Sequence, residues 1–337
     1  MNVLVIGGSR FSGRKILQIL DEKGHDITVI NRGVAEESTG IPFLKNLKYQ
    51  YPSKIKVIHL DRKNHEQIKD KLRNNDFEAI IDTCAFNERD IQSIINIASD
   101  KLEHYIFTST GSVYDDNQEI QPISEDAPLG SEADDDPVPY SRDKRRAESI
   151  LRKNFKETGF PFTIIRPTYI YGPYNYIYRE AYFFDRIIDG KTIFMPGNGE
   201  YLLDFVHAFD VAWLLTIPLE NKKAIGNAYN ASGQGGLTLN NYCKMLFRIY
   251  EKTTEIRHYD PSILENDSLK PENQNQMFPF SFNEHFILSK EKAAIDLNYS
   301  PIQLEKGLAG AFYWYSENKN PQWHGDYTFD EKLVKLL

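Results

Sequence analysis

Cysteine and long apolar runs are both scarce in this sequence. Only Cys84 and Cys243 occur among 337 residues, and two thiols make neither a disulfide framework nor a zinc site built from paired CxxC motifs. No apolar stretch approaches the roughly 20 residues that span a bilayer, and the first residues lack the basic leader and cleavage site of a secretory signal. We therefore expect a soluble protein of the reducing cytoplasm.

Excess positive charge is also missing. Lys and Arg number 40 against 48 Asp and Glu, so the net charge is −8 at pH 7. Such a chain is not suited to coat nucleic acid or an anionic membrane, and neither is an expected partner. No HExxH motif or carboxylate cluster predicts a bound metal. Hydrophobic residues make up 41% and charged residues 26%, ordinary values that exclude a mainly disordered chain.

Short apolar runs alternate with helical patterns through the first half of the chain. Strands are expected over residues 3–6, 27–30, 55–60, 79–82 and 105–108. Between them, apolar residues recur with the three- to four-residue spacing of an amphipathic helix. This alternation predicts parallel strands joined by right-handed helical crossovers. The predicted fold class is α/β, a doubly wound parallel sheet of the Rossmann type.

The second half of the chain is less regular. Residues 115–139 are acidic and contain prolines, which is typical of a loop. Further elements are expected at 140–156 (helix), 162–166 (strand), 207–219 (helix) and 228–231 (strand). The expected dinucleotide-binding domain covers 1–173, with 204–232 returning to its sheet, and a smaller α/β substrate lobe comprises 174–203 and 233–337.

The first site is the turn Gly7-Gly8-Ser9-Arg10-Phe11-Ser12-Gly13, between a strand and a helix. Phosphate binding needs free backbone N–H groups at a helix N-terminus and room for close approach, and glycine supplies both. Many strand-to-helix turns contain glycine, but the position in the first βα unit favours a dinucleotide. Arg10 occupies the place of the fingerprint's middle glycine.

The second site is Asn31-Arg32 at the end of the second strand. A fold of this type that prefers NAD usually has Asp or Glu there for the ribose hydroxyls. Arg32 and Arg10 together can face a 2′-phosphate, which slightly favours NADP over NAD. The alternative is that Arg32 is a solvated loop arginine.

The third site is Tyr140 and Lys144, four residues apart on one helix face. A nearby ammonium lowers the pKa of a phenol, so that tyrosine can act as an acid or base near neutral pH. A surface pair would show the same spacing. Hydroxyls at Thr108–Ser112 end the fifth strand, at the sheet edge where open α/β folds bind ligands, and this favours the catalytic interpretation.

With these motifs in their order, the chain resembles the extended short-chain dehydrogenases/reductases of the NAD-dependent epimerase/dehydratase family. The GGSRFSG turn is similar to the atypical branch whose signature is GGTRFxG, a branch that includes proteins associated with RNA. The other matching motifs are TSTGSVY at 108–114, SEDAPL at 124–129, YSRDK at 140–144, IRPTYIYGP at 165–173, GNG at 197–199, DFVHAFDVA at 204–212, YNASG at 229–233 and LSKEKAAIDL at 288–297.

The resemblance implies roles for individual residues. Thr110, Tyr140 and Lys144 match the catalytic set, and Ser112 lies where dehydratases of the family carry an acid, which argues against a dehydratase proton shuttle. Lys144 also binds the nicotinamide ribose. The remaining residues implied to bind the cofactor are Gly7, Gly8, Ser9, Arg10, Phe11, Gly13, Asn31, Arg32, Asp61, Ala85, Pro167 and Ile170.

The expected substrate is a nucleotide sugar, with one departure from the family. Sugar-nucleotide members commonly have Arg before the Asp of the DFVH segment, where it binds the diphosphate; here that residue is Leu203. Arg179 is expected to compensate. Otherwise the substrate is not a nucleotide sugar. The aromatic run 169–184 is expected to stack on a base or a sugar, to enclose an uncharged or apolar substrate, or to form plain core.

The expected function is hydride transfer between an NAD or NADP nicotinamide and a carbinol or ketone carbon, leading to epimerisation, dehydration or reduction. Two alternatives stay open: a catalytically silent NAD(P)-binding protein that is RNA-associated or regulatory, and a reductase of a non-nucleotide apolar substrate. The resemblance also implies a possible homodimer.

Overall fold

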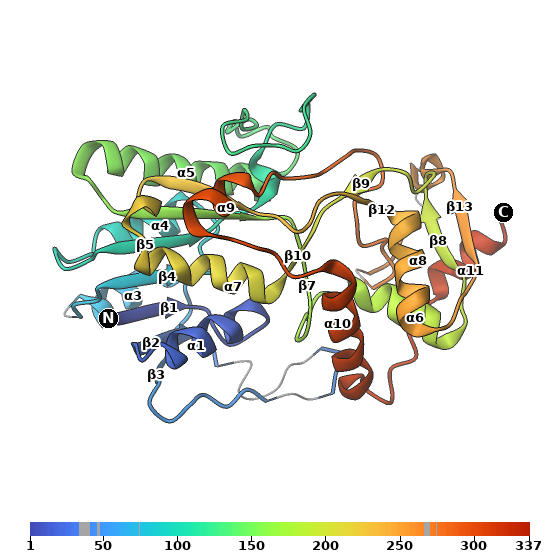
Figure 1. Ribbon diagram of the computed structural model, residues 1–337, viewed down its shortest axis with the longest axis horizontal. Coiled ribbons are helices and arrows are strands. Elements are labelled where there is room, and N and C mark those ends of the chain that lie inside the picture. The colour runs from blue at the N-terminus through green and yellow to red at the C-terminus, as the bar shows by residue number, and fades with distance from the viewer. Residues whose placement is uncertain (34–40, 46–47, 74, 266–269, 274) are drawn as a thin grey trace.

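The computed structural model describes residues 1–337 except 34–40, 46–47, 74, 266–269 and 274. Its centre is a seven-stranded parallel sheet of order β11-β6-β5-β4-β1-β2-β3, visible in Figure 1. The strands are β1 (Asn2–Ile6), β2 (Asp26–Asn31), β3 (Lys56–His59), β4 (Ala79–Asp82), β5 (His104–Thr108), β6 (Phe162–Pro167) and β11 (Asn227–Ala231). The order reverses between β1 and β4, as in a doubly wound fold, so the predicted fold class is confirmed.

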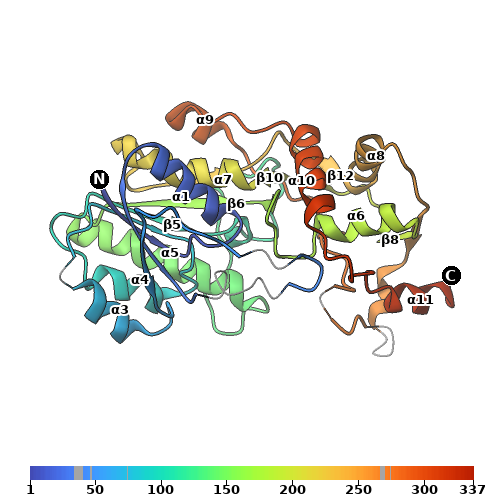
Figure 2. The ribbon, with the colours of Figure 1, turned by 90° about the horizontal axis from the view of Figure 1, so that it is seen from below.

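Helices cover both faces of this sheet because its strands alternate buried side chains between two cores. Val3 and Val5 of β1 join one core, and Leu4 and Ile6 join the other. Figure 2 shows the two helical layers. The first layer contains α1 (Ser12–Glu22) and α7 (Ala208–Thr216), and the second contains α3 (His65–Leu72), α4 (Glu88–Ile95) and α5 (Pro139–Thr158).

Most predicted elements agree with the structure to within about two residues. The helix predicted over 207–219 is shorter, because α7 ends at Thr216 and a 3-10 turn follows over Ile217–Glu220. Pro218 has no N–H to continue the α-helical bonds. Further 3-10 turns lie at Gly111–Val113, Lys222–Ala224 and Pro261–Glu265.

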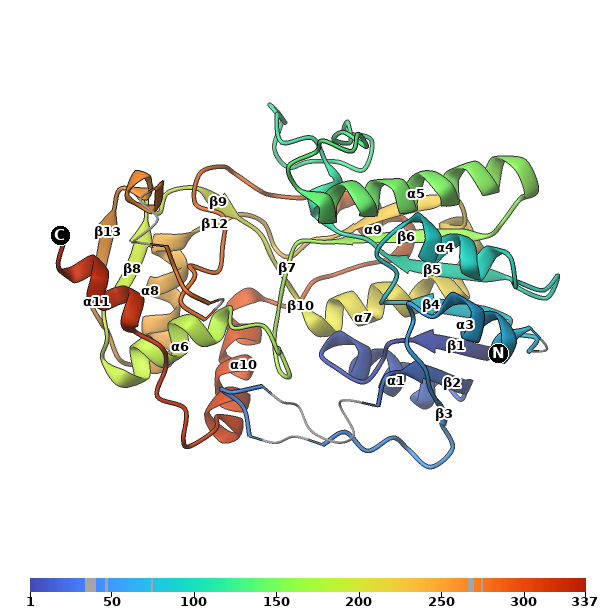
Figure 3. The same cartoon turned by 180° about the vertical axis from the view of Figure 1, so that it is seen from behind.

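A smaller lobe stands at one end of the sheet, as Figures 1 and 3 show. Its core is rich in aromatic side chains, among them Phe183, Phe184 and Tyr242, all fully buried or nearly so. Its elements are α6 (Glu180–Asp189), β8 (Ile193–Pro196), β9 (Leu202–Leu203), β12 (Leu237–Thr238), α8 (Leu239–Tyr250), β13 (Ile256–Tyr259), α10 (Leu304–Asn318) and α11 (Thr328–Val334).

The chain crosses between the sheet and the lobe several times. β7 (Tyr169–Tyr171) and β10 (Phe205–His207) form a parallel pair at the junction. Helix α9 (Glu291–Leu297) lies within the range predicted for the lobe, but it packs on the main sheet beside β11. It does so because Ala293 and Leu297 are buried in the same core as α1 and α7.

In the described part of the chain, no helix combines the length and apolar character needed to cross a bilayer. Within the same residues, no cluster of His, Cys, Asp and Glu is suited to hold a metal ion.

Candidate active site

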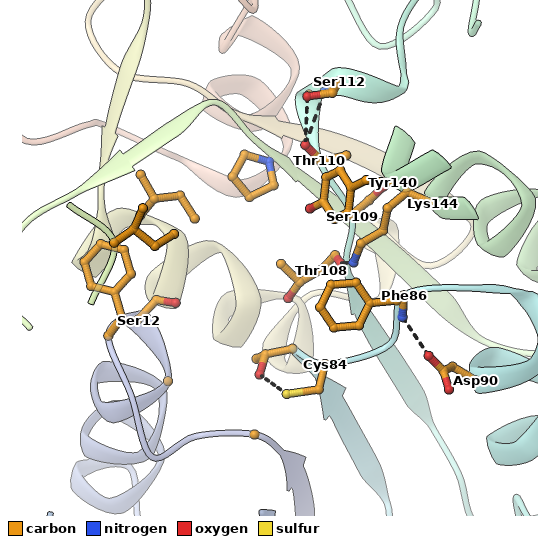
Figure 4. A pocket seen from close by; sticks show the side chains of 18 of the residues that line it. Ser12, Cys84, Phe86, Asp90, Thr108, Ser109, Thr110, Ser112, Tyr140 and Lys144 are labelled. Atoms are coloured by element: carbon orange, nitrogen blue, oxygen red, sulfur yellow. Dashed lines mark hydrogen bonds between the residues drawn. The ribbon is translucent and has the colours of Figure 1, made fainter. Parts of the chain in front are cut away.

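A cavity of about 1230 Å³ opens at the carboxyl edge of the sheet, where the lobe meets it. In Figure 4, Ser12 at the start of α1 lies on one side of this cavity, with Thr110, Tyr140 and Lys144 on the other. The predicted site residues that line it are Gly7, Gly8, Ser9, Arg10, Phe11, Gly13, Asn31, Arg32, Asp61, Thr110, Ser112, Tyr140, Lys144, Pro167, Ile170 and Arg179. Ala85 alone among the predicted set does not.

The glycine-rich turn is a tight cradle. Gly7 and Gly8 have φ angles of 108° and 87°, which side chains rarely adopt. A Cβ at Gly13 would lie 2.6 Å from the Cα of Gly8, so the start of α1 packs directly on the turn. The resulting backbone surface at a helix N-terminus suits a pyrophosphate, and the residues present therefore fit a dinucleotide.

The end of β2 presents one exposed cation. Asn31 is buried, and its amide donates to the Tyr51 hydroxyl at 2.6 Å while its side-chain oxygen accepts from the Gly33 N–H. Asn31 therefore shapes the turn, whereas Arg32 is exposed at the cavity rim. Asp61, also at the rim, accepts a hydrogen bond from the Lys63 N–H at 2.9 Å.

A buried charge cluster under the β4 loop was not predicted. Arg62 donates to Asp82 at 3.0 Å, and the other Asp82 oxygen accepts from the backbone N–H groups of Cys84 and Ala85 at 3.0 and 2.8 Å. Because its N–H is bound to Asp82, Ala85 is fully buried and its side chain does not line the cavity. The available signal was Asp82 itself, a carboxylate ending an apolar strand.

Lys144 is buried at the centre of the site. Its ammonium donates to the carbonyl oxygens of Ala85 and Thr108, both at 2.7 Å. It also lies 5.1 Å from the ring centre of Phe86 and 4.7 Å from that of Phe107, close enough for cation–π attraction. Burial lowers the pKa of Lys144 to about 8, so the side chain is still mainly cationic at neutral pH.

Tyr140 lies one helical turn before Lys144 and faces the cavity (Figure 4). The Lys144 ammonium is 6.0 Å from its ring centre. Partial burial raises the pKa of the Tyr140 phenol, while hydrogen bonding to Thr110 and the charge of Arg179 act to lower it. Lys144 was expected to lower this pKa, but here its ammonium points to backbone carbonyls instead.

Thr110 begins the 3-10 turn after β5. Its hydroxyl donates to the Ser112 hydroxyl at 3.3 Å and accepts from the Ser112 N–H at 3.2 Å. Ser112 therefore supports Thr110 and offers no carboxylic acid to the cavity.

A second buried network, also not predicted, lies behind Thr110. Glu148, two helical turns after Tyr140, accepts from Ser109 at 2.7 Å and from two nitrogens of Arg166 at 3.0 and 2.5 Å. Since Ser109 precedes Thr110 and Arg166 precedes Pro167, this pair ties the ends of β5 and β6 to α5. Sequence reasoning missed it because the partners are far apart in the chain.

Arg179 lines the cavity next to the start of α6, with its guanidinium carbon 5.5 Å from the ring centre of Tyr169. Leu203 does not reach the cavity. It is fully buried in the lobe core and pairs with Leu237 across β9 and β12.

The strand order and the glycine-rich turn after β1 define a dinucleotide-binding enzyme fold. Residues 3–232 match the model of the NAD dependent epimerase/dehydratase family, and the chain belongs to this family of extended short-chain dehydrogenase/reductase enzymes.

Three individual proteins resemble this chain at sequence identities between 18% and 29%. The chain is 29% identical over 335 residues to the chloroplast stem-loop binding protein of 41 kDa b of Arabidopsis thaliana, covering 98% of this chain and 84% of that protein. The UDP-glucose 4-epimerase of Thermotoga maritima, solved with UDP-glucose, has a TM-score of 0.74 at 22% identity and covers 94% of this chain and 99% of that one. The dTDP-glucose 4,6-dehydratase of Bacillus anthracis, solved with NAD, has a TM-score of 0.74 at 18% identity, with coverage of 96% and 98%.

Proposed function

We propose that this chain catalyses reversible hydride transfer at a carbinol carbon, with Tyr140 as the proton-transfer group. The observation that supports this most is the convergence of Thr110, Tyr140 and Lys144 on one cavity, opposite the glycine-rich turn. These residues come from two different elements, β5 with its following turn and α5, so their meeting is a property of the fold and not of local sequence.

A bound nicotinamide dinucleotide supplies the hydride acceptor. The glycine-rich turn from Gly7 to Gly13 would hold its phosphates and Asp61 its adenosine end, while Pro167 and Ile170 would border the nicotinamide. Ala85 contributes only its backbone, through the carbonyl that Lys144 binds.

Tyr140 removes the proton of the substrate hydroxyl, and Thr110 holds the same oxygen. The Lys144 ammonium lies 6.0 Å from the Tyr140 ring centre but donates to backbone carbonyls, so Thr110 and Arg179 are the groups that act to lower the pKa of the Tyr140 phenol. Ser112 in place of an acid favours epimerisation or simple oxidation and reduction over dehydration, because elimination of water needs a second proton donor.

The proposed substrate class is the nucleotide sugars, with Arg179 as the cationic partner of the diphosphate. Two solved structures with a similar fold are those of a UDP-glucose 4-epimerase and a dTDP-glucose 4,6-dehydratase. Buried phosphate charge requires a cationic partner, and a guanidinium can bind two phosphate oxygens at once. Leu203 cannot provide this contact.

For the cofactor we propose NADP over NAD, because Arg32 lines the cavity directly after β2, where NAD-specific folds have a carboxylate, and Arg10 adds a second cation to the same cavity. The proposed compartment remains the cytoplasm, and the proposed assembly a homodimer.

The test is to mix the purified protein with NADP or NAD and a panel of UDP- and dTDP-sugars, and to follow the absorbance of reduced nicotinamide. We expect reduction of bound cofactor with at least one sugar. Binding of neither dinucleotide in a calorimetric titration would refute the proposal at its first step.

A second candidate function is RNA association, which one observation favours: the relative that covers 98% of this chain is named a stem-loop binding protein. RNA retention that falls steeply with salt would support it. The net charge of −8 and the assembled Thr110, Tyr140 and Lys144 favour the enzyme.

A further inference from the structure

The covering segment, residues 172–179 between β7 and α6, contacts the glycine-rich turn through Tyr176 and helix α1 through Tyr174. The Arg10 guanidinium carbon lies 5.6 Å from the ring centre of Tyr176, and the Phe11 ring meets the same tyrosine edge-on at 6.4 Å. One turn further along α1, Arg14 lies 4.5 Å from the ring centre of Tyr174. The lobe therefore reaches across to the phosphate-binding turn by aromatic and cationic contacts.

The covering segment is held in shape by buried hydrogen bonds. The Glu180 carboxylate accepts from the Gly172 N–H at 2.9 Å and from the Asn175 amide at 2.8 Å. The Asn175 side-chain oxygen in turn accepts from the Ile177 N–H at 3.0 Å. Tyr174 adopts a φ of 68°, a conformation that non-glycine residues adopt only when their surroundings hold it.

Tyr176 is 42% exposed and lines the cavity together with Arg10. We propose that Arg10 and Tyr176 form a latch across the glycine-rich turn, which slows the release of a bound dinucleotide. This inference rests on the proposed function, because it requires that the turn bind the dinucleotide phosphates.

An arginine side chain can contact both partners that the latch requires, the Tyr176 ring and a phosphate group. A guanidinium is planar, so it can stack its face on an aromatic ring while its N–H groups donate in the plane to phosphate oxygens. Glycine, the residue that the fingerprint places here, can do neither. Arg10 can therefore contact a phosphate bound at the turn and Tyr176 of the covering segment at the same time.

The experiment measures the dissociation rate of reduced dinucleotide, displaced by an excess of the oxidised form and followed by stopped-flow fluorescence. A cation–π contact of ordinary strength corresponds to an increase of about 2- to 30-fold when it is lost. We expect Tyr176→Ala to raise the rate by this amount and Tyr176→Phe to leave it nearly unchanged, because the ring is retained.

Coupling between the two residues is tested in the Arg10→Gly background. There the rate is expected to be raised already, and Tyr176→Ala should add nothing further. Arg10→Gln removes the cation but keeps a polar side chain, and it serves in the same way if the glycine variant does not fold.

Equal effects of Tyr176→Ala with and without Arg10, or no effect in either background, would overturn the latch while leaving dinucleotide binding intact. Absence of dinucleotide binding to the unmodified protein is a different failure, and it refutes the proposed function itself.

Discussion

Lys144 combines almost complete burial with a positive charge. Burial lowers the pKa of Lys144 from 10.5 to about 8, so the contribution of this residue to the free energy of unfolding should depend on pH. Between these two pH values the unfolded chain binds the proton and the native protein does not. Stability therefore rises with pH across this window.

We predict that, on going from pH 8 to pH 10.5, the ligand-free protein gains up to about 3 kcal/mol of stability relative to Lys144→Met. Urea unfolding of both proteins at a series of pH values checks this, and taking the difference removes the titration of the tyrosines. Parallel pH profiles for the two proteins would show that the native ammonium is well solvated.

Arg179 is the residue on which the substrate class depends. We predict that Arg179→Ala raises the KM for a nucleotide sugar by about 10- to 100-fold, the effect of losing one charged hydrogen bond. Cofactor affinity should change little, and the KM should change more than the turnover number, because the diphosphate contact is made equally in the ground and transition states. Some loss of turnover is expected as well, because the charge of Arg179 acts to lower the pKa of the Tyr140 phenol. Arg257→Ala is the control, since Arg257 pairs with Glu255 on the lobe surface. An unchanged KM would show that Arg179 does not bind the diphosphate.

Arg32 tests the cofactor preference. Calorimetric titration of the unmodified protein should show NADP binding at least as tightly as NAD. In Arg32→Ala we expect NADP affinity to fall by about tenfold or more, as for a lost charge-assisted contact, and NAD affinity to stay the same. If NAD binds more tightly and is indifferent to the substitution, Arg32 is only a loop residue.

Single residues could be predicted where a local motif carries the chemistry. The spacing of Tyr140 and Lys144 and the hydroxyls after β5 are visible in the sequence, and these residues line one cavity. Asp82 and Glu148 were missed, because their partners Arg62 and Arg166 are 20 and 18 residues away and no local pattern links them. Long-range pairing of buried charges is decided by the fold.

At the scale of elements, the first βα turn depends on glycine at position 13. We predict that Gly13→Ala weakens dinucleotide binding roughly tenfold or more, because the new methyl would lie 2.6 Å from the Gly8 backbone and displace the turn. Calorimetry with NAD and NADP measures the loss. Gly310→Ala in α10 is the matched control: nothing lies within 4 Å of its added carbon, and a helical alanine is favoured over glycine. Equal affinity in both variants would mean that the turn does not hold the cofactor.

Element positions on the main sheet followed from periodicity, since buried parallel strands are short apolar runs. β4 is the clearest case, with the predicted and observed bounds both Ala79–Asp82. The lobe was harder to predict. Helix α9 carries only two fully buried apolar residues, Ala293 and Leu297, and its return to the sheet depends on contacts with β11 that no local pattern encodes.

At the scale of the whole molecule, the proposed reaction requires the sheet and the lobe together. The sheet supplies the glycine-rich turn, Thr110 and α5, and the lobe supplies Arg179 and the covering segment. β7 and β10 hold the two parts at the junction where the cavity lies.

The central claim is that Tyr140 transfers the proton that accompanies hydride transfer in this cavity. It is tested most directly by the rate of nicotinamide reduction in Tyr140→Phe, with a sugar that reduces the cofactor in the unmodified protein. We expect the rate to fall by about 10²- to 10⁴-fold with cofactor affinity and melting temperature unchanged, because the ring still packs and only the transferable proton is lost. A reduction rate close to that of the unmodified protein would contradict the assignment of Tyr140.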